Sequence, residues 1–139
     1  MLANGTKLGY SATGTTPITY IDLVGSKEIP AFESNPEEVE NTPLSASNKT
    51  YEKGIGDYGD LEYTFKWDNS SATSPYRVMQ GYDASGATVF FKHEYKDGTA
   101  ATFSAQVSVS ITGGALNAVI DAKVKLTLNS SIVWTNPTT

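Results

Sequence analysis

The chain has 139 residues, which suits one domain with a single sizeable hydrophobic core. Its formal net charge is −5, and most of its 15 acidic residues fall between Glu28 and Glu62, which argues against a surface that grips nucleic acid. The absence of cysteine excludes disulfides, zinc–thiolate sites and a cysteine nucleophile. We expect no signal peptide and no membrane insertion, because no apolar run approaches the roughly 18 residues that span a bilayer.

The first third of the chain predicts little regular structure. Residues 1–16 are small, polar and glycine-rich, so we expect a flexible or partner-ordered arm. Strands are predicted over 17–24 and, more briefly, over 37–40. The stretch 41–57 then shows no apolar period. Because loops longer than about 12–15 residues are uncommon inside compact domains, this one is predicted to be functional or disordered.

Residues 58–67 alternate between apolar and polar side chains, which predicts a half-buried strand. The expected core face carries Leu61, Tyr63, Phe65 and Trp67. The expected polar face carries Asp60, Glu62, Thr64 and Lys66.

One short helix is predicted in the segment 69–81. Ser70 or Ser71 could cap its start, and Pro75 is favoured in a first turn. Gly81 or Gly86 could end it, since glycine readily adopts the left-handed conformation at a helix terminus.

The rest of the chain predicts further strands. The first covers 87–94, and the most regular alternation of the chain follows over 102–112. Gly113-Gly114 predicts a two-residue hairpin turn into a return strand over 116–128. A short apolar segment, 132–134, precedes the C-terminal tail.

These elements predict an all-β fold with six or seven strands and one short helix. The long strands each have one apolar and one polar face, so a sheet built from them would cover a core on one side and face water on the other.

The sequence contains only weak signals for catalytic or ligand-binding residues. His93 is the single histidine and has no nucleophile or orienting acid suggested beside it, so we expect a packing or strand-surface role. Gly54-Ile55-Gly56 leads into a strand instead of a helix, unlike a phosphate-binding loop. A carboxylate pair for glycoside hydrolysis would have to come from Glu38, Glu40, Asp60 and Glu62, yet these acids suggest a solvated face without an aromatic cleft.

Residues 35–67 read NPEEVENTPLSASNKTYEKGIGDYGDLEYTFKW. This string resembles the long hairpin of the tail tube proteins, or major tail proteins, of long-tailed, non-contractile phages. The segments TKLGY at 6–10, PITYI at 17–21 and DAKVKLTL at 121–128 are similar to other parts of the same family. The resemblance therefore extends over nearly the whole chain, although no single residue in it is chemically obligatory.

The resemblance implies a β-sandwich or half-barrel, with residues 1–139 as one tail-tube domain. Six subunits would form a ring whose sheets join into a continuous barrel, and stacked rings would bound a path for DNA, which passes without specific binding. The implied partners are further copies of the chain and the tail-tip or initiator, tape-measure and tail-terminator proteins. The implied location is the virion tail, assembled in the host cytoplasm, with no cofactor, no metal and no catalytic site.

Two sets of residues follow from combining the resemblance with the alternation. The loop predicted to reach the neighbouring ring contains Pro43, Leu44, Asn48, Lys49, Tyr51, Lys53, Gly54 and Gly56. The predicted lumen-facing residues are Glu38, Glu40, Asp60, Glu62, Thr64, Lys66, Ser104, Gln106, Ser108, Asp121 and Lys123. The mean charge of this lining is expected to be negative, moderated by its lysines, which would repel phosphate.

Two other classes of function stay open from the sequence. A small β-sandwich module that binds carbohydrate or a virion partner would need exposed aromatic residues on one sheet face. A hydrolase would depend on the four acids named above for the carboxylate pair.

Overall fold

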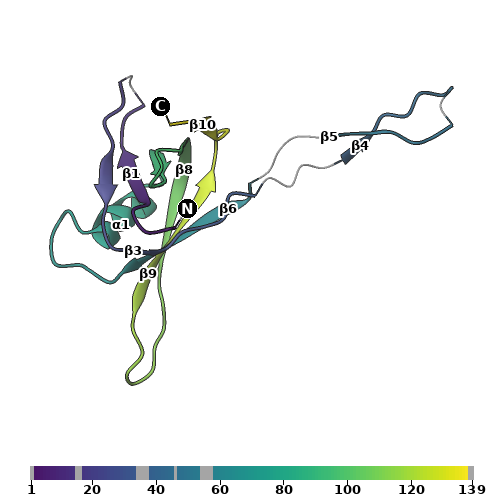
Figure 1. Cartoon of the computed structure of the whole chain (residues 1–139). Helices are drawn as coiled ribbons and strands as arrows, with labels where there is room; N and C mark the ends of the chain where they lie inside the picture. The colour runs from purple at the N-terminus through teal and green to yellow at the C-terminus, as the bar shows by residue number, and fades with distance from the viewer. Residues whose placement is uncertain (1, 15–16, 34–37, 46, 54–57, 138–139) are drawn as a thin grey trace.

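The computed structural model describes residues 2–14, 17–33, 38–45, 47–53 and 58–137. It is mostly β-structure with one helix, and its strands are antiparallel (Figure 1). One sheet has the order β2-β1-β7-β8-β9-β6-β3, with β10 pairing to β8, and a separate small sheet consists of β4 and β5. The main-sheet strands are β1 (Lys7–Ser11), β2 (Ile21–Leu23), β3 (Ser26–Glu28), β6 (Asp60–Lys66), β7 (Thr88–Glu94), β8 (Ala100–Ile111), β9 (Asp121–Leu128) and β10 (Val133–Thr135).

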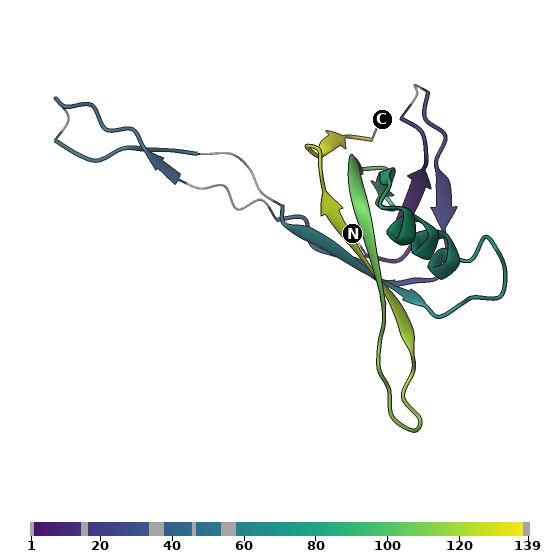
Figure 2. The ribbon, with the colours of Figure 1, turned by 180° about the vertical axis from the view of Figure 1, so that it is seen from behind.

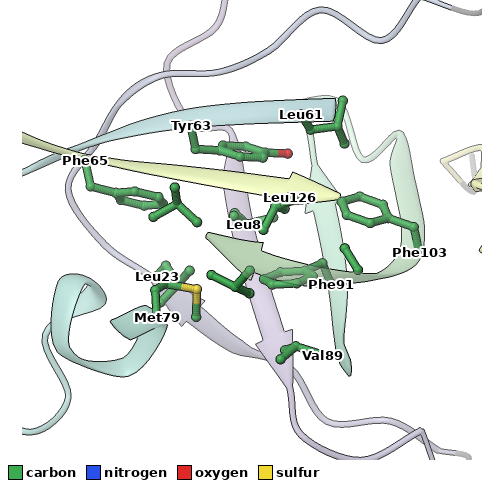
Figure 3. Close-up of a cluster of buried hydrophobic side chains, with 13 residues drawn as sticks. Leu8, Leu23, Leu61, Tyr63, Phe65, Met79, Val89, Phe91, Phe103 and Leu126 are labelled. Carbon is green, nitrogen blue, oxygen red and sulfur yellow. The ribbon is translucent and has the colours of Figure 1, made fainter. Parts of the chain in front are cut away.

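The expected all-β class with one short helix is confirmed, and the sheet of the single chain is not closed into a barrel. The composition of the buried core shows that the sheet is curled. Side chains from β2, near one end of the strand order, and from β6, near the other, join one buried cluster (Figure 3). A single sheet can bring both ends to one core only if it curls around it.

The core face of β6 is predicted correctly at three of four positions. Leu61, Tyr63 and Phe65 are each at most 1% exposed, as period-two alternation requires. Trp67 is the exception, because it lies just beyond the end of β6 and is 38% exposed. There its ring packs against Tyr76, with the ring centroids 4.6 Å apart.

Helix α1 (Pro75–Ser85) covers the open side of the curled sheet and inserts Met79 into the core (Figure 3). Pro75 occupies its first turn, as predicted. Of the two glycines proposed to end the helix, Gly86 does so at φ 68° in the left-handed conformation, and the helix therefore extends beyond the predicted segment 69–81. The N-cap position belongs to Ser74, however, and not to Ser70 or Ser71.

The prediction of a flexible N-terminal arm over 1–16 does not hold for residues 7–11. Residues 7–11 form β1, which lies inside the sheet between β2 and β7. Glycine at position 9 allows β1 to lie this close to its neighbour, because a Cβ there would lie only 2.9 Å from the Cβ of Tyr20. The predicted strand over 17–24 is in turn limited to Ile21–Leu23.

The predicted two-residue turn at Gly113-Gly114 is also wrong. β8 and β9 pair as a hairpin, but β9 begins only at Asp121, so residues 112–120 connect the strands. Asn117 adopts a positive φ of 68° in this connection. The connection extends beyond the body at the end opposite to β10 (Figures 1 and 2).

β4 (Glu38–Glu40) and β5 (Tyr51–Lys53) form the second hairpin that leaves the body. It projects far from the main sheet in both views (Figures 1 and 2). The strand predicted over 37–40 therefore pairs with β5, which lies inside the predicted loop 41–57. It does not pair with the strand predicted after that loop, because β6 pairs with β9 and β3.

Candidate assembly surfaces

The extended hairpin, residues 38–53, presents apolar side chains to solvent. Leu44 is fully exposed, and Val39 and Tyr51 are 52% and 56% exposed. Pro43, Asn48 and Lys49 are exposed as well, whereas Gly54 and Gly56 lie outside the described residues, as does the side chain of Lys53.

Hydrogen bonds stiffen this hairpin beyond its strands. The Asn41 amide donates to the Thr50 carbonyl at 2.8 Å, and the Thr50 amide donates to the Thr42 hydroxyl at 2.9 Å. A two-stranded hairpin alone is marginally stable in water. Its exposed apolar side chains would gain burial from a partner surface.

The polar face of β6 and β9 carries a ladder of ion pairs. Lys125 lies 3.1 Å from Asp60, and Lys123 lies 3.4 Å from Glu62. At the far end Asp121 pairs with Lys27 of β3 at 3.0 Å. Exposed pairs of this kind each contribute about 0–1 kcal/mol, so their main effect is on the charge of the surface.

Strand pairing divides the residues of the predicted lining between two sheets. Glu38 and Glu40 belong to the separate small sheet, so they do not share a face with Asp60 and Glu62. Without them the lysines of the ladder balance its carboxylates, and the expected negative surplus is absent from the described part of this face. The carboxylate constellation considered for hydrolysis is likewise split between two sheets.

Thr64, another residue of the predicted lining, is shielded from solvent in the single chain. It is 8% exposed, although its neighbours along β6 on the same face, Glu62 and Lys66, are exposed. Thr64 has Glu28 of β3 as its paired residue on one side and Lys123 of β9 on the other. A short side chain between two longer ones loses solvent contact, which alternation alone does not reveal.

The remaining predicted lining residues lie on β8, and their side chains make specific contacts. The Ser104 hydroxyl donates to Asn129 Oδ1 at 2.7 Å, and the Gln106 side-chain amide donates to the Gly86 carbonyl at 3.2 Å. Ser108 is exposed and lies opposite Lys125. The polar face of the sheet therefore continues from β6 across β9 to β8.

Helix α1 supplies a hydrogen-bond acceptor to one free strand edge of this sheet. β7 pairs with β8 only up to Gln106, which leaves the following residues of β8 without a strand on that side. There the Val109 amide donates to the carboxylate of Asp83 on α1 at 3.1 Å. A side chain that occupies an edge amide hinders strand addition at that position.

His93 is fully buried and so has a packing role, as expected. Its Nδ1 lies 2.6 Å from the Tyr63 hydroxyl, and within the described residues its Nε2 has no hydrogen-bond partner. The rings of Phe32 and Tyr95 pack against it with centroids 4.9 and 4.6 Å away. Burial lowers the pKa of His93 to about 4, and burial together with Tyr95 raises the pKa of Tyr63.

Both tryptophans are partly exposed, but they do not form one aromatic platform. The Trp134 indole N–H donates to the Tyr58 hydroxyl at 3.4 Å, near the start of β6, whereas Trp67 follows its end. In the described ranges, no group of three or more His, Asp or Glu residues is arranged to hold a metal ion. No helix there is long and apolar enough to cross a membrane.

A group of exposed apolar side chains surrounds the β8–β9 connection, which the sequence pattern does not predict. Ile111, Leu116, Val119 and Ile120 are 51%, 93%, 69% and 47% exposed around the β8–β9 connection. The alternation predicts strands for all four, whereas only Ile111 lies in one. Asn117 was the available signal for a turn among them, because asparagine tolerates a positive φ.

No protein-family model and no curated protein sequence matches this chain. Two solved structures with the same fold come from the tail of one particle and from the baseplate of another. One is from the tail of an empty GTA particle with C6 symmetry: 14% identity, TM-score 0.68, and 94% of each chain covered. Another is from the six-fold symmetrised baseplate of the anti-feeding prophage: 10% identity, TM-score 0.58, with 94% of this chain and 91% of the other covered.

Proposed function

We propose that this chain is a structural subunit of a phage-type tail tube, in which rings of six copies stack around a channel that DNA crosses during delivery. The main observation in support of this proposal is the fold that 94% of this chain shares with 94% of a component of a C6-symmetric tail. A likeness at this level of identity establishes fold alone, and the assembly features described next add support for the function.

The extended hairpin and the polar face of the main sheet supply those features. The extended hairpin buries little of its own surface and leaves Leu44 fully exposed, which suits a segment that folds against a neighbouring ring. The polar face of β6, β8 and β9 suits a wet channel wall. Its balanced ion pairs present no cluster of unpaired lysines, so DNA would meet a surface without strong attraction.

The partners in this proposal are further copies of the chain, a tail-tip or initiator protein, a tape-measure protein and a tail terminator. The location is the tail of the virion, after assembly in the host cytoplasm, and the non-contractile type is part of the proposal. The protein acts by self-assembly and not as an enzyme.

Mass measurement in solution, followed by negative-stain microscopy at rising concentration, tests the proposal. We expect rings or tubes of uniform width, with or without an added tail-tip partner. A particle that stays monomeric at every concentration and with its tail-tip partners would overturn it. Retention of a stable monomer that binds a soluble glycan would favour the binding-module alternative.

A further inference from the structure

The connection between β8 and β9 forms an uncharged apolar projection, here called the β8–β9 tip (residues 111–120). It contains no Lys, Arg, Asp or Glu in ten residues. Leu116 is 93% exposed and Val119 is 69% exposed. An exposed group of large apolar side chains on a projection marks an interaction site more often than a scattered single residue does.

A second uncharged apolar surface lies near the other end of β8, here called the β10 hollow. It is an open hollow of about 260 Å³ with no charged residue in its lining. Its walls include Phe90 of β7, Thr102 of β8, Val133 of β10 and Ser131. This volume is below the roughly 300–1,000 Å³ of small-molecule pockets. It suits one or two apolar side chains of a protein partner.

The tip and the hollow lie at opposite ends of one strand. Thr102 and Ile111 are nine positions apart on β8, which corresponds to about 30 Å at the rise of a β-strand. β10 and the β8–β9 connection accordingly lie at opposite ends of the body in both views (Figures 1 and 2). The tip therefore cannot enter the hollow of its own chain.

We propose that the β8–β9 tip of one copy inserts Leu116 and Val119 into the β10 hollow of a second copy in the adjacent ring. An apolar knob and a pocket at opposite ends of one molecule make a head-to-tail contact that repeats without closing. Because neither surface carries a charge, their contact buries no unpaired ion. The inference rests on the proposed function and adds a second stacking contact to the extended hairpin.

Disulfide trapping tests this contact, since the chain has no cysteine of its own. Leu116→Cys in one preparation and Ser131→Cys in another are mixed, assembled and oxidised. A disulfide requires Cα atoms within about 7 Å, so covalent heterodimers are expected only if the tip reaches the hollow. Leu44→Cys mixed with Ser131→Cys is the matched control, because Leu44 is equally exposed on the other projection.

A second measurement avoids cysteine geometry. Leu116→Ser combined with Val119→Ser is expected to raise the critical concentration for tube formation at least about tenfold, because two apolar side chains would lose burial. Val24→Ser is the control, since Val24 is 70% exposed but lies on neither surface. The monomers should melt like wild type.

The outcomes separate the two proposals. Preferential trapping of Leu116→Cys together with the raised critical concentration supports the contact. Wild-type tubes without that trapping, or with equal trapping by Leu44→Cys, overturn the contact and leave the tube function standing. Tubes of the double serine variant at the wild-type concentration also overturn it. Absence of any assembly in the wild type overturns both.

Discussion

Phe65 in the body is fully buried, whereas Leu44 on the extended hairpin is fully exposed. The same contrast separates the curled sheet as a whole from its two projections. In the body, apolar side chains from seven elements meet in one cluster, so the chain buries them without a partner. In the projections, the large apolar side chains meet solvent. A region of the first kind determines stability, and in the proposed function a region of the second kind would bind a partner.

Replacing Phe65 by Ala should give the largest loss of stability. The side chain is fully buried in the core cluster, and such truncations cost about 3–5 kcal/mol. Urea unfolding followed by fluorescence measures the loss. Leu44→Ala is the control from the projections and should change the free energy of unfolding by less than about 0.5 kcal/mol. Similar losses for both would erase the distinction between body and projection.

Acid should weaken the body through His93. Its pKa is about 4 in the fold and about 6.5 when unfolded, so the unfolded chain binds more protons between these values. The free energy of unfolding should therefore fall as the pH drops from about 6.5 to 4, by up to about 3 kcal/mol. Above pH 6.5 this contribution is fully present.

The measurement is a series of urea titrations at pH 7, 6, 5 and 4. His93→Gln serves as the comparison, because glutamine does not titrate in this range. The variant also loses the packing and the Tyr63 contact of His93, so the quantity compared is the change of stability with pH in each protein and not its absolute stability. If both proteins lose the same stability on acidification, His93 is not the group responsible.

Shortening the extended hairpin should leave stability nearly unchanged and yet abolish stacking. Deletion of residues 45–48 lies beyond the hydrogen bonds between Asn41, Thr42 and Thr50. Shorter loops alter closure entropy only slightly, so we expect a change under about 1 kcal/mol. Electron microscopy should show rings without tubes. Tubes of ordinary length from the deleted chain would disprove a stacking role for this segment, and Ser47→Ala is the control.

The ion-pair ladder should contribute least. A double-mutant cycle with Glu62→Ala and Lys123→Ala should give a coupling energy of about 0.2–1 kcal/mol, because both side chains are about half exposed. It should shrink in 1 M salt, where screening acts over about 3 Å. A coupling above 2 kcal/mol would mean that this surface is far less solvated than its exposure indicates.

Much of the body was predictable from local pattern. Alternation identified the core face of β6 and most of β8, because a strand with one face buried must change polarity at every residue. Pro75 and Gly86 marked the helix, because each residue has a backbone preference that operates locally. For His93 the sequence left a packing or a strand-surface role open, and it gave no sign of the contact with Tyr63, thirty positions away.

Pairing between distant strands was not predictable. The sequence by itself determined the fold class, the helix, the main core positions and the unusual length of the segment between β3 and β6. Only the tertiary structure decided that residues 7–11 lie inside the sheet, that Thr64 is shielded between β3 and β9, and that Glu38 and Glu40 stand apart from Asp60 and Glu62. The reason is physical: periodicity states which face of a strand is apolar, whereas its neighbours depend on which strands the folded chain brings beside it.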